Sequence, residues 1–160
     1  MILSDAEIGW AAGFFDGEGC VMIKHHRRGS YYLEIRVDQV DPPPLLELQR
    51  LFRGTVGHHR RRHPHPPNWS DFYYWSCSTR EARRALETML PYLRVKAELA
   101  TLAIKFQSGK RPRGTSLAKC EFDEENWYAE AVKALNTSGP QREIAELPAK
   151  PENPQLKLVM

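Results

Sequence analysis

Hydrophobic and polar residues follow two different periods along this chain, and the changes between them predict its elements. Ser4-Asp5-Ala6-Glu7 forms a capping box at the start of a helix that ends near Gly17–Gly19. Alternation of period two then predicts strands over 21–28 and 31–40, joined by a turn at Gly29-Ser30.

A second helix and hairpin follow, without an internal repeat of the sequence. A helix begins at the prolines after Asp41 and ends at Gly54, and a second hairpin covers 55–62 and 71–78. Helices over 79–90 and 96–107 complete an order of αββαββαα. Hairpins without crossovers predict an antiparallel four-stranded sheet and the α+β class.

The region after the helical and strand pattern has a different composition. We expect residues 1–108 to form the core domain, and 109–138 to hold a basic loop and a last helix capped at Asp123–Asn126. Residues 139–160 contain four prolines and are predicted to be a flexible tail.

Composition narrows the class of protein. The chain is 41% hydrophobic and 27% charged, which is typical of a globular domain. Its three cysteines form no C-x-x-C pair, which argues against a zinc site or a disulfide framework. No apolar stretch is long enough for a membrane helix, and the acidic start argues against a signal peptide. We therefore expect an intracellular protein, in the cytoplasm or nucleoid of a bacterium or phage-infected cell, with an organelle as the alternative.

Charge is distributed unevenly although the net charge is only +3. Residues 24–63 and 80–119 are basic blocks, whereas residues 1–23 and 120–160 are acidic. This pattern suggests one positive face, as in nucleic-acid-binding proteins, but a solvated charge pattern explains the distribution equally well.

The first predicted helix carries a stripe of small residues. Gly9, Gly13 and Gly17 are spaced four apart, with Ala12 beside them. Each helical glycine costs about 1 kcal/mol relative to alanine, so the spacing favours a close approach by another helix. The natural partner is the same helix of a second copy across a two-fold axis. The alternative is a glycine-weakened helix that packs on its own sheet.

Asp16 and Glu18 stand at the C-terminal end of this helix, where carboxylates oppose the helix dipole. A bound cation would relieve this opposition, and two-fold symmetry would bring together the Glu18 residues of two copies. Clustered carboxylates and backbone carbonyls are typical of Mg²⁺ sites. The alternative is a solvated helix end.

Three segments resemble motifs of the LAGLIDADG homing endonucleases. The run Trp10–Gly19 is similar to the motif that names the family, Arg36–Asp41 to the end of its second strand, and Leu90–Lys96 to its Leu-Pro-aromatic-Leu…Lys segment. The resemblance covers about residues 4–108 and is to the single-motif, homodimeric type.

The resemblance implies an αββαββα fold with a saddle-shaped sheet. It also implies an intron-encoded enzyme that hydrolyses both strands of a long, near-palindromic DNA target, leaves short 3′ overhangs and uses Mg²⁺ or Mn²⁺. Glu18 and the backbone carbonyl of Gly19 would bind the metals, while Gln39 and Lys96 would orient or activate the attacking water. Asp16 would be structural, near the helix interface. The implied dimer interface comprises Gly9, Ala12, Gly13, Asp16 and Gly17.

Strand alternation predicts which side chains would face DNA. If Val21 and Ile23 belong to the core, the polar side chains of the strands share the opposite face and can contact base edges in the major groove. Lys110, Arg111 and Arg113 are candidates for phosphate contacts. The predicted sheet contacts are Lys24, His26, Arg28, Tyr32, Glu34, Arg36, Asp38, His58, Arg60, Arg62, Asp71, Tyr73 and Trp75.

Three other functions remain open at this point. The first is a DNA-binding regulator or intron-splicing cofactor (a maturase) on the same fold that does not cleave. The second is an unrelated metal nuclease built on the histidines between His58 and His65. The third is a basic interaction module, which leaves the glycine stripe and its terminal acids unexplained.

Overall fold

The computed structural model describes residues 2–27, 29–59, 71–111, 118–136 and 149–151. Five helices and four strands follow the predicted order, with a short 3-10 helix where Pro91 interrupts the helical run. Their bounds are α1 Asp5–Glu18, β1 Gly19–His25, β2 Tyr31–Gln39, α2 Pro43–Phe52, β3 Thr55–His59, β4 Phe72–Ser78, α3 Thr79–Met89, η1 Leu90–Tyr92, α4 Ala97–Ser108 and α5 Lys119–Leu135.

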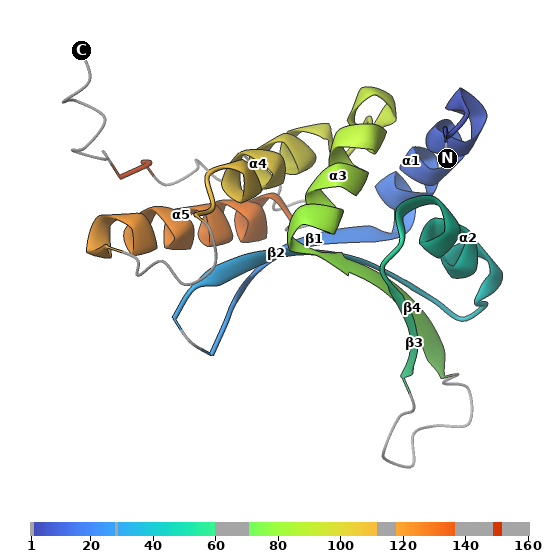
Figure 1. The fold of residues 1–160 in the computed structure, drawn as a ribbon, viewed down its shortest axis with the longest axis horizontal. Helices are drawn as coiled ribbons and strands as arrows, with labels where there is room; N and C mark the ends of the chain where they lie inside the picture. The colour runs from blue at the N-terminus through green and yellow to red at the C-terminus, as the bar shows by residue number, and fades with distance from the viewer. Residues whose placement is uncertain (1, 28, 60–70, 112–117, 137–148, 152–160) are drawn as a thin grey trace.

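The sheet is antiparallel throughout, with the strand order β1-β2-β4-β3. The two hairpins therefore lie side by side, with β2 and β4 in the centre. Figure 1 shows the sheet arched below the helices, so that both hairpin ends point away from the helical layer. The predicted α+β class and the curved four-stranded antiparallel sheet are confirmed.

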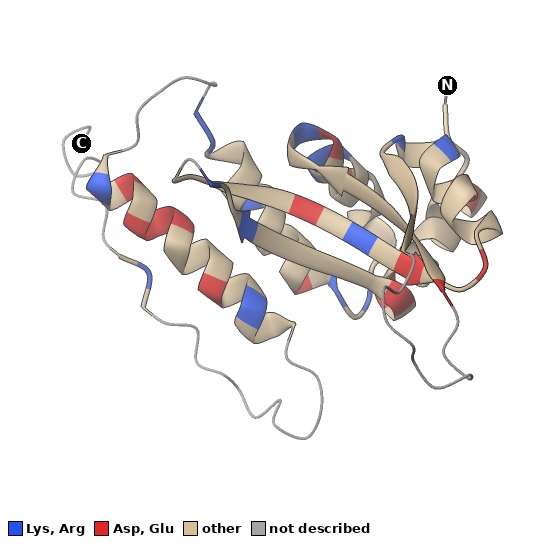
Figure 2. Cartoon of the chain, turned by 90° about the horizontal axis from the view of Figure 1, so that it is seen from below, with Lys and Arg blue, Asp and Glu red and all other residues tan. Residues whose placement is uncertain are grey.

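The helices pack on one face of the sheet and leave the other face open (Figures 1 and 2). The core between the layers is formed by aliphatic side chains of β2, such as Leu33, Ile35 and Val37, against small and apolar side chains of the helices. None of these three strand side chains is accessible to solvent. The polar residues between them therefore lie on the open face.

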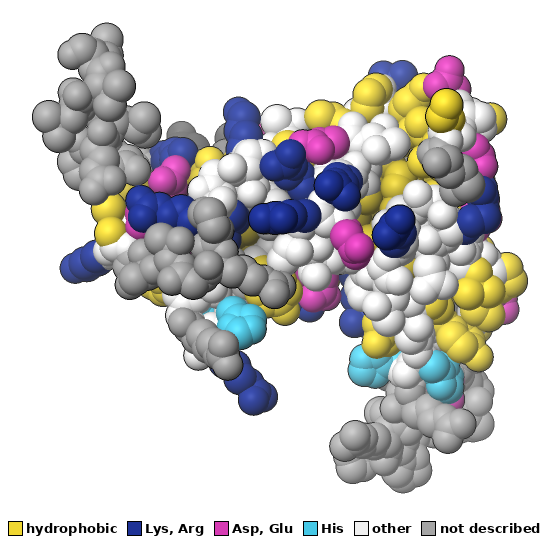
Figure 3. Space-filling model, in the orientation of Figure 1, with side chains coloured by type: hydrophobic (Ala, Val, Ile, Leu, Met, Phe, Trp, Pro, Cys, Tyr) yellow, Lys and Arg dark blue, Asp and Glu magenta, His cyan; other side chains and the backbone are white. Residues whose placement is uncertain are grey.

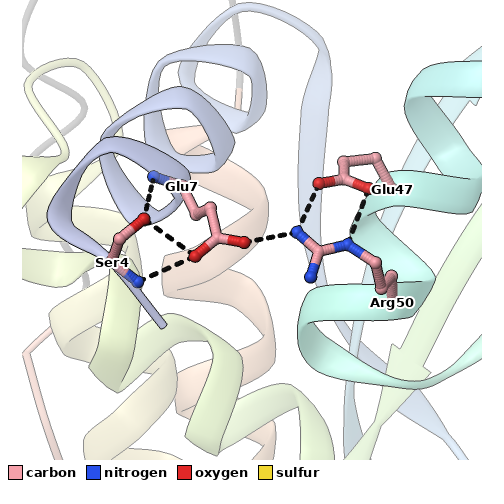
Figure 4. Close-up of polar contacts among 4 residues, drawn as sticks. All are labelled: Ser4, Glu7, Glu47 and Arg50. Carbon is pink, nitrogen blue, oxygen red and sulfur yellow. Dashed lines mark hydrogen bonds and ion pairs between the residues drawn. The ribbon is translucent and has the colours of Figure 1, made fainter. Parts of the chain in front are cut away.

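A polar network fixes the start of α1 (Figure 4). The Ser4 hydroxyl accepts from Glu7 N–H at 3.3 Å, and the Glu7 carboxylate accepts from Ser4 N–H at 2.8 Å, which confirms the predicted capping box. Arg50 of α2 donates to the other oxygen of Glu7 at 2.5 Å and also to Glu47. The network thereby joins α1 to the neighbouring helix.

The last helix begins earlier than expected. α5 starts at Lys119, because Glu121 accepts from Ala118 N–H at 2.8 Å and so caps the helix before the predicted start at Asp123. Glu125 is buried and accepts from the backbone N–H of Tyr31 at 3.0 Å, which attaches α5 to the first hairpin. Most of the predicted tail, 139–148 and 152–160, lies outside the described residues.

Among the described residues, the search for membrane spans finds no helix of sufficient length and hydrophobicity.

Candidate active centre and nucleic-acid interface

Glu18 lies at a direct junction between a helix and a strand. α1 ends at Glu18 and β1 begins at Gly19, whose N–H donates to the carbonyl of Phe15. A Cβ at Gly19 would lie 2.4 Å from the Phe15 ring and 2.5 Å from its carbonyl oxygen, so this junction requires glycine. Glu18 is exposed, and its carboxylate has no hydrogen-bond or ion-pair partner among the described residues.

Asp16 connects the end of α1 to the start of α4. Its carboxylate accepts from three consecutive backbone N–H groups, those of Arg94 at 2.6 Å, Val95 at 3.2 Å and Lys96 at 2.9 Å. Partial burial raises the pKa of Asp16, but these hydrogen bonds and the charge of Lys96 outweigh it and lower the pKa below its ordinary value. The carboxylate of Asp16 is therefore engaged within its own chain, where it holds the segment 94–96 against the end of α1.

Lys96 reaches the same helix end with its side chain. Its Nζ donates to the backbone carbonyl of Asp16, two residues before Glu18. A positive charge at this position interacts favourably with the negative end of the helix dipole. It also partly offsets the negative charge of the acids in the last turn. Lys96 also acts on Cys20: burial raises the pKa of this thiol, while the positive charge of Lys96 opposes the rise.

Gln39 lies near this centre by strand register. Gly19 pairs with Val37 in the antiparallel β1–β2 ladder, so a position opposite Gln39 would be residue 17, in the last turn of α1. Gln39 shares the helix-facing side of β2 with Val37 and is half-buried. The fold therefore brings the three predicted catalytic residues, Glu18, Gln39 and Lys96, to the end of α1.

The outer side of α1 carries the small-residue stripe. Gly13 and Gly17 are exposed, and a Cβ at either position would meet no atom within 4 Å. Their own chain therefore does not require glycine at these two positions, although the opposite side of α1 packs on the core of its own chain through Ala11 and Phe15. A Cβ at Gly9 would lie 3.8 Å from the Tyr92 ring.

Ala12 is a correction to the predicted dimer interface. Its side chain is fully buried in the core of its own chain, together with Ala11 and Phe15. The inward side of α1 uses alanine to lie close to the sheet layer, so Ala12 has no surface to offer a second copy.

The open face of the sheet carries polar and aromatic side chains in ion pairs and stacks. Lys24 pairs with Glu34 at 2.6 Å. Arg36 pairs with Asp38 and lies over the Tyr74 ring. Figure 3 shows the hollow below the sheet, with histidine side chains on both arms beside it. By register and burial, the open face comprises Cys20, Met22, Lys24, Tyr32, Glu34, Arg36, Asp38, Thr55, Gly57, His59, Phe72, Tyr74 and Ser76. His26, just past β1, contacts Tyr32 through its ring.

Comparisons with known proteins agree with this geometry. No family model and no curated protein matches the sequence. Solved structures do match. One is the homing endonuclease I-CvuI in complex with the I-CreI target in 2 mM Mg with the DNA not cleaved, at a TM-score of 0.65, 24% identity and coverage of 86% of this chain and 85% of that one.

Two further structures show the same similarity. I-CvuI in complex with its own target, Sro1.3, in 2 mM Ca matches at a TM-score of 0.64 and 22% identity, with coverage of 84% of this chain and 85% of that chain. The archaeal intron-encoded homing endonuclease I-Vdi141I, in complex with DNA, matches at 0.64 and 17%, with coverage of 84% and 87%. This chain has the LAGLIDADG homing endonuclease fold.

In the second hairpin of this homing endonuclease fold, the residues predicted to lie on the open face of the sheet lie on the helix-facing side instead. Trp75 is fully buried and donates its indole N–H to the carbonyl of Arg53 at 2.7 Å, so it cannot contact DNA. Tyr73 and His58 pair with each other in the β3–β4 ladder. Each lies two residues from a position that packs against the core, so both belong to the helix-facing side of the sheet. The exposed Asp71 lies 3.5 Å from His58. The predictions for these four residues were therefore one residue out of register.

Sequence reasoning missed Tyr74, Gly57 and His59, which occupy the open face of this hairpin. The signal that could have found them is the pair Trp75 and Cys77, which are spaced as one face of a strand and are both typical of cores.

The predicted phosphate contacts Lys110 and Arg111 are engaged within the chain. Lys110 pairs with Glu125 and Arg111 pairs with Glu121, so both attach α5 to the segment after α4. Acids of the last helix compensate their charges, which was not expected from the basic run alone. Arg28, Arg60, Arg62 and Arg113 lie outside the described residues.

Proposed function

We propose that this chain is a site-specific endonuclease of double-stranded DNA that acts as a homodimer with divalent metal ions. The observation that carries the proposal is the exposed, unpaired Glu18 at the junction of α1 and the sheet, with Lys96 and Gln39 beside the same helix end. The open, curved face of the sheet begins next to this centre. I-CvuI and I-Vdi141I, which share the fold, form complexes with DNA.

The oxygen donors at Glu18 fit half of a divalent cation site. Glu18 supplies an exposed, unpaired carboxylate at the helix end, and hard cations such as Mg²⁺ prefer oxygen ligands of this kind. In the described part of one chain, no group of three His, Cys, Asp or Glu residues could hold a metal. A second copy related by a two-fold axis would add a second Glu18 and its carbonyls. The structures of I-CvuI were obtained with Mg or Ca present.

The exposed stripe of α1 supports the dimer. Gly13 and Gly17 are exposed positions without a side chain in the two turns before Glu18. Two such helices can approach closely, and the contact is self-complementary, as a two-fold interface requires. Close approach here brings the two Glu18 residues toward each other.

The residues of the chain then have separate roles. The open face positions the duplex, and Glu18 holds the metal. The Lys96 ammonium stabilises the negative charge that develops at the attacked phosphate. Gln39 can orient water through its amide. When bound, divalent metal ions activate water and neutralise the leaving oxygen in phosphodiester hydrolysis. We expect cleavage of a long, near-palindromic target that leaves short 3′ overhangs.

The test is cleavage of a randomised duplex library by the purified protein in Mg²⁺, beside Glu18→Gln. Glu7→Gln is the matched control, because Glu7 is a glutamate at the other end of the same helix. We expect the parent and the control to cut one long near-palindromic site. Glu18→Gln should bind that site without cutting it, and EDTA should stop cleavage by the parent.

Other outcomes distinguish the rival functions. Tight, selective binding without cleavage by any of the three proteins would indicate a regulator or maturase on this fold. Cleavage by Glu18→Gln at the parental rate would exclude Glu18 as the metal ligand. If the parent selects no sequence at all, the proposed use of the sheet is wrong.

A further inference from the structure

Arg36 is held in a fixed orientation on the open face of the sheet. Its Nε and Nη2 both lie 2.7 Å from Oδ1 of Asp38, which follows it by two positions along β2 and lies on the same face. The centre of its guanidinium lies 4.2 Å from the centroid of the Tyr74 ring. The guanidinium is therefore held along one edge by a carboxylate and on one face by an aromatic ring.

The aromatic platform is itself built into the sheet. Tyr74 lies on β4 beside Gly57 of β3, and the two are paired in the ladder. A Cβ at Gly57 would lie 2.4 Å from the ring and the hydroxyl of Tyr74. Glycine at position 57 thus lets the Tyr74 ring lie across the neighbouring strand, and the ring of His59 contacts it at 5.7 Å between centroids.

This arrangement leaves one donor edge of Arg36 for a ligand. Asp38 occupies the Nε–Nη2 edge, so the N–H groups of Nη1 and the outer N–H of Nη2 remain as a planar fork. Two parallel donors in a plane match the O6 and N7 acceptors of guanine in the major groove. Because the fork is already oriented, less side-chain freedom is lost when it binds.

We propose that Arg36 recognises a guanine in each half-site, with Asp38, Tyr74 and Gly57 as the residues that position it. This inference rests on the proposed function, because it requires a duplex on the open face. It changes the role predicted for Asp38, whose carboxylate holds Arg36 rather than contacting a base.

The strand register gives the place of this guanine in the target. Arg36 pairs with Cys20, two residues from Glu18, whereas Lys24 lies four residues farther along β1, or about 13 Å. At about 3.4 Å per base pair, this separation spans roughly four base pairs. The guanine therefore belongs to the inner part of each half-site, near the cleaved bonds, and occurs symmetrically in both.

The Lys24–Glu34 pair on the same face is a natural control. It is an ion pair across strands, and no ring of the described residues lies over it. A lysine is a flexible point charge without a planar fork, so we expect weaker discrimination among bases at its position.

The test is selection of bound sequences from a randomised duplex DNA library by the full chain in EDTA, so that recognition is measured without cleavage. We expect the parent to select guanine at one inner position of each half-site. Arg36→Lys and Tyr74→Leu should each reduce that preference at least about fivefold. Tyr74→Phe should retain it, because the ring that supports the guanidinium is preserved. Lys24→Met should change only an outer position.

Gly57→Ala gives an independent test of the platform. It leaves Arg36, Asp38 and Tyr74 unchanged in sequence but displaces the ring, so it should weaken the same guanine preference as Tyr74→Leu. It also covers the case in which Tyr74→Leu does not fold.

The outcomes separate this inference from the proposed function. If the parent selects a site but Arg36→Lys leaves every base preference unchanged, Arg36 does not recognise guanine. If Arg36→Lys abolishes the preference while Gly57→Ala and Tyr74→Leu retain it, the positioning role is wrong. If the parent selects no sequence, the proposed function fails and the inference fails with it.

Discussion

The two hairpins of the sheet separate their faces in different ways. In the first, formed by β1 and β2, the core positions are aliphatic and the open positions are polar, as Ile35 and Arg36 illustrate. In the second, four aromatic residues follow one another from Phe72 to Trp75, so both faces are aromatic. The first hairpin thus separates its faces by polarity, whereas the second separates them by the shape and hydrogen bonding of each ring.

The difference teaches what sets the register where polarity does not. Trp75 takes the core position because its indole N–H reaches the carbonyl of Arg53 and its ring contacts Phe52 at 6.4 Å between centroids. Once Trp75 is inside, Tyr74 must face outward, since neighbouring residues of a strand point to opposite faces. One well-satisfied aromatic residue therefore decides the face of the entire strand.

The largest effect is expected from the two central aromatics of the second hairpin. Trp75→Ala removes a fully buried ring and should lower the free energy of unfolding by about 3–5 kcal/mol. Tyr74→Ala, one residue away on the open face, should cost far less. Urea unfolding of both variants measures the difference. A larger loss for Tyr74→Ala would mean that the register described here is wrong.

A smaller effect is expected from two glycines with nearly the same positive φ. Gly54, which leads into the second hairpin, has a φ of +84°, and Gly29, in the turn of the first, has a φ of +86°. Alanine at Gly29 meets no atom within 4 Å, so it should cost only the backbone strain of about 1–2 kcal/mol. At Gly54 a Cβ would lie 2.5 Å from the carbonyl oxygen of Ser76, which adds a clash with backbone.

Thermal unfolding of Gly29→Ala and Gly54→Ala checks this difference directly. We expect Gly54→Ala to have the clearly lower Tm. Equal Tm values would show that β4 beside Gly54 can move enough to accommodate the added Cβ.

Much of the fold could be predicted because its local signals agree with one another. The capping box at Ser4, the alternation in β2 and the proline at 91 each specify one element and conflict with nothing nearby. The register of the second hairpin could not be predicted in the same way. It depends on contacts with residues distant in sequence, as between Trp75 and Arg53.

The residues of the candidate site also differ in whether local sequence signals identify them. Glu18 could be identified from the local pattern of glycines and acids at a helix end. The engagement of Asp38 with Arg36, and of Lys110 with Glu125, could not be identified, because composition counts charges without showing which of them neutralise each other. Tyr74 was missed because its importance arises from Gly57 on the neighbouring strand.

The first hairpin begins at the end of α1, and Asp16 tests how firmly that junction is held. Asp16→Asn keeps the side-chain shape but removes the charge that three backbone N–H groups bind, so we expect a loss of about 1–2 kcal/mol at pH 7. Because the folded-state pKa of Asp16 is lowered, its stabilisation is present above the ordinary value of 3.8 and is lost as pH falls through the folded pKa.

Urea unfolding of Asp16→Asn as a function of pH measures this dependence. The difference from the parent should shrink below pH 3.8, whereas the exposed Asp41→Asn control should match the parent throughout. A difference that is constant over pH would show that the charge of Asp16 contributes nothing, and that packing alone holds the junction.

The smallest effect is expected at the surface network that joins the helices leading into the two hairpins. Arg50 of α2 is exposed and Glu7 of α1 is partly exposed, and surface ion pairs of this kind contribute little because water and salt screen them (Figure 4). Hydrogen bonds from Ser4 N–H, then from Arg50, lower the pKa of Glu7 to about 2. Its contribution is therefore complete above pH 4.5 and disappears as pH falls toward 2.

Glu7→Gln should consequently lower the Tm only slightly at pH 7 and low salt, and by still less in high salt. Glu87→Gln is the matched control, since Glu87 pairs with Arg83 at 2.9 Å within α3 and joins no second helix. A Glu7→Gln loss as large as that of Gly54→Ala would mean that the two helices are coupled through this network. The two hairpins would then not be independent in stability, although their faces are set in different ways.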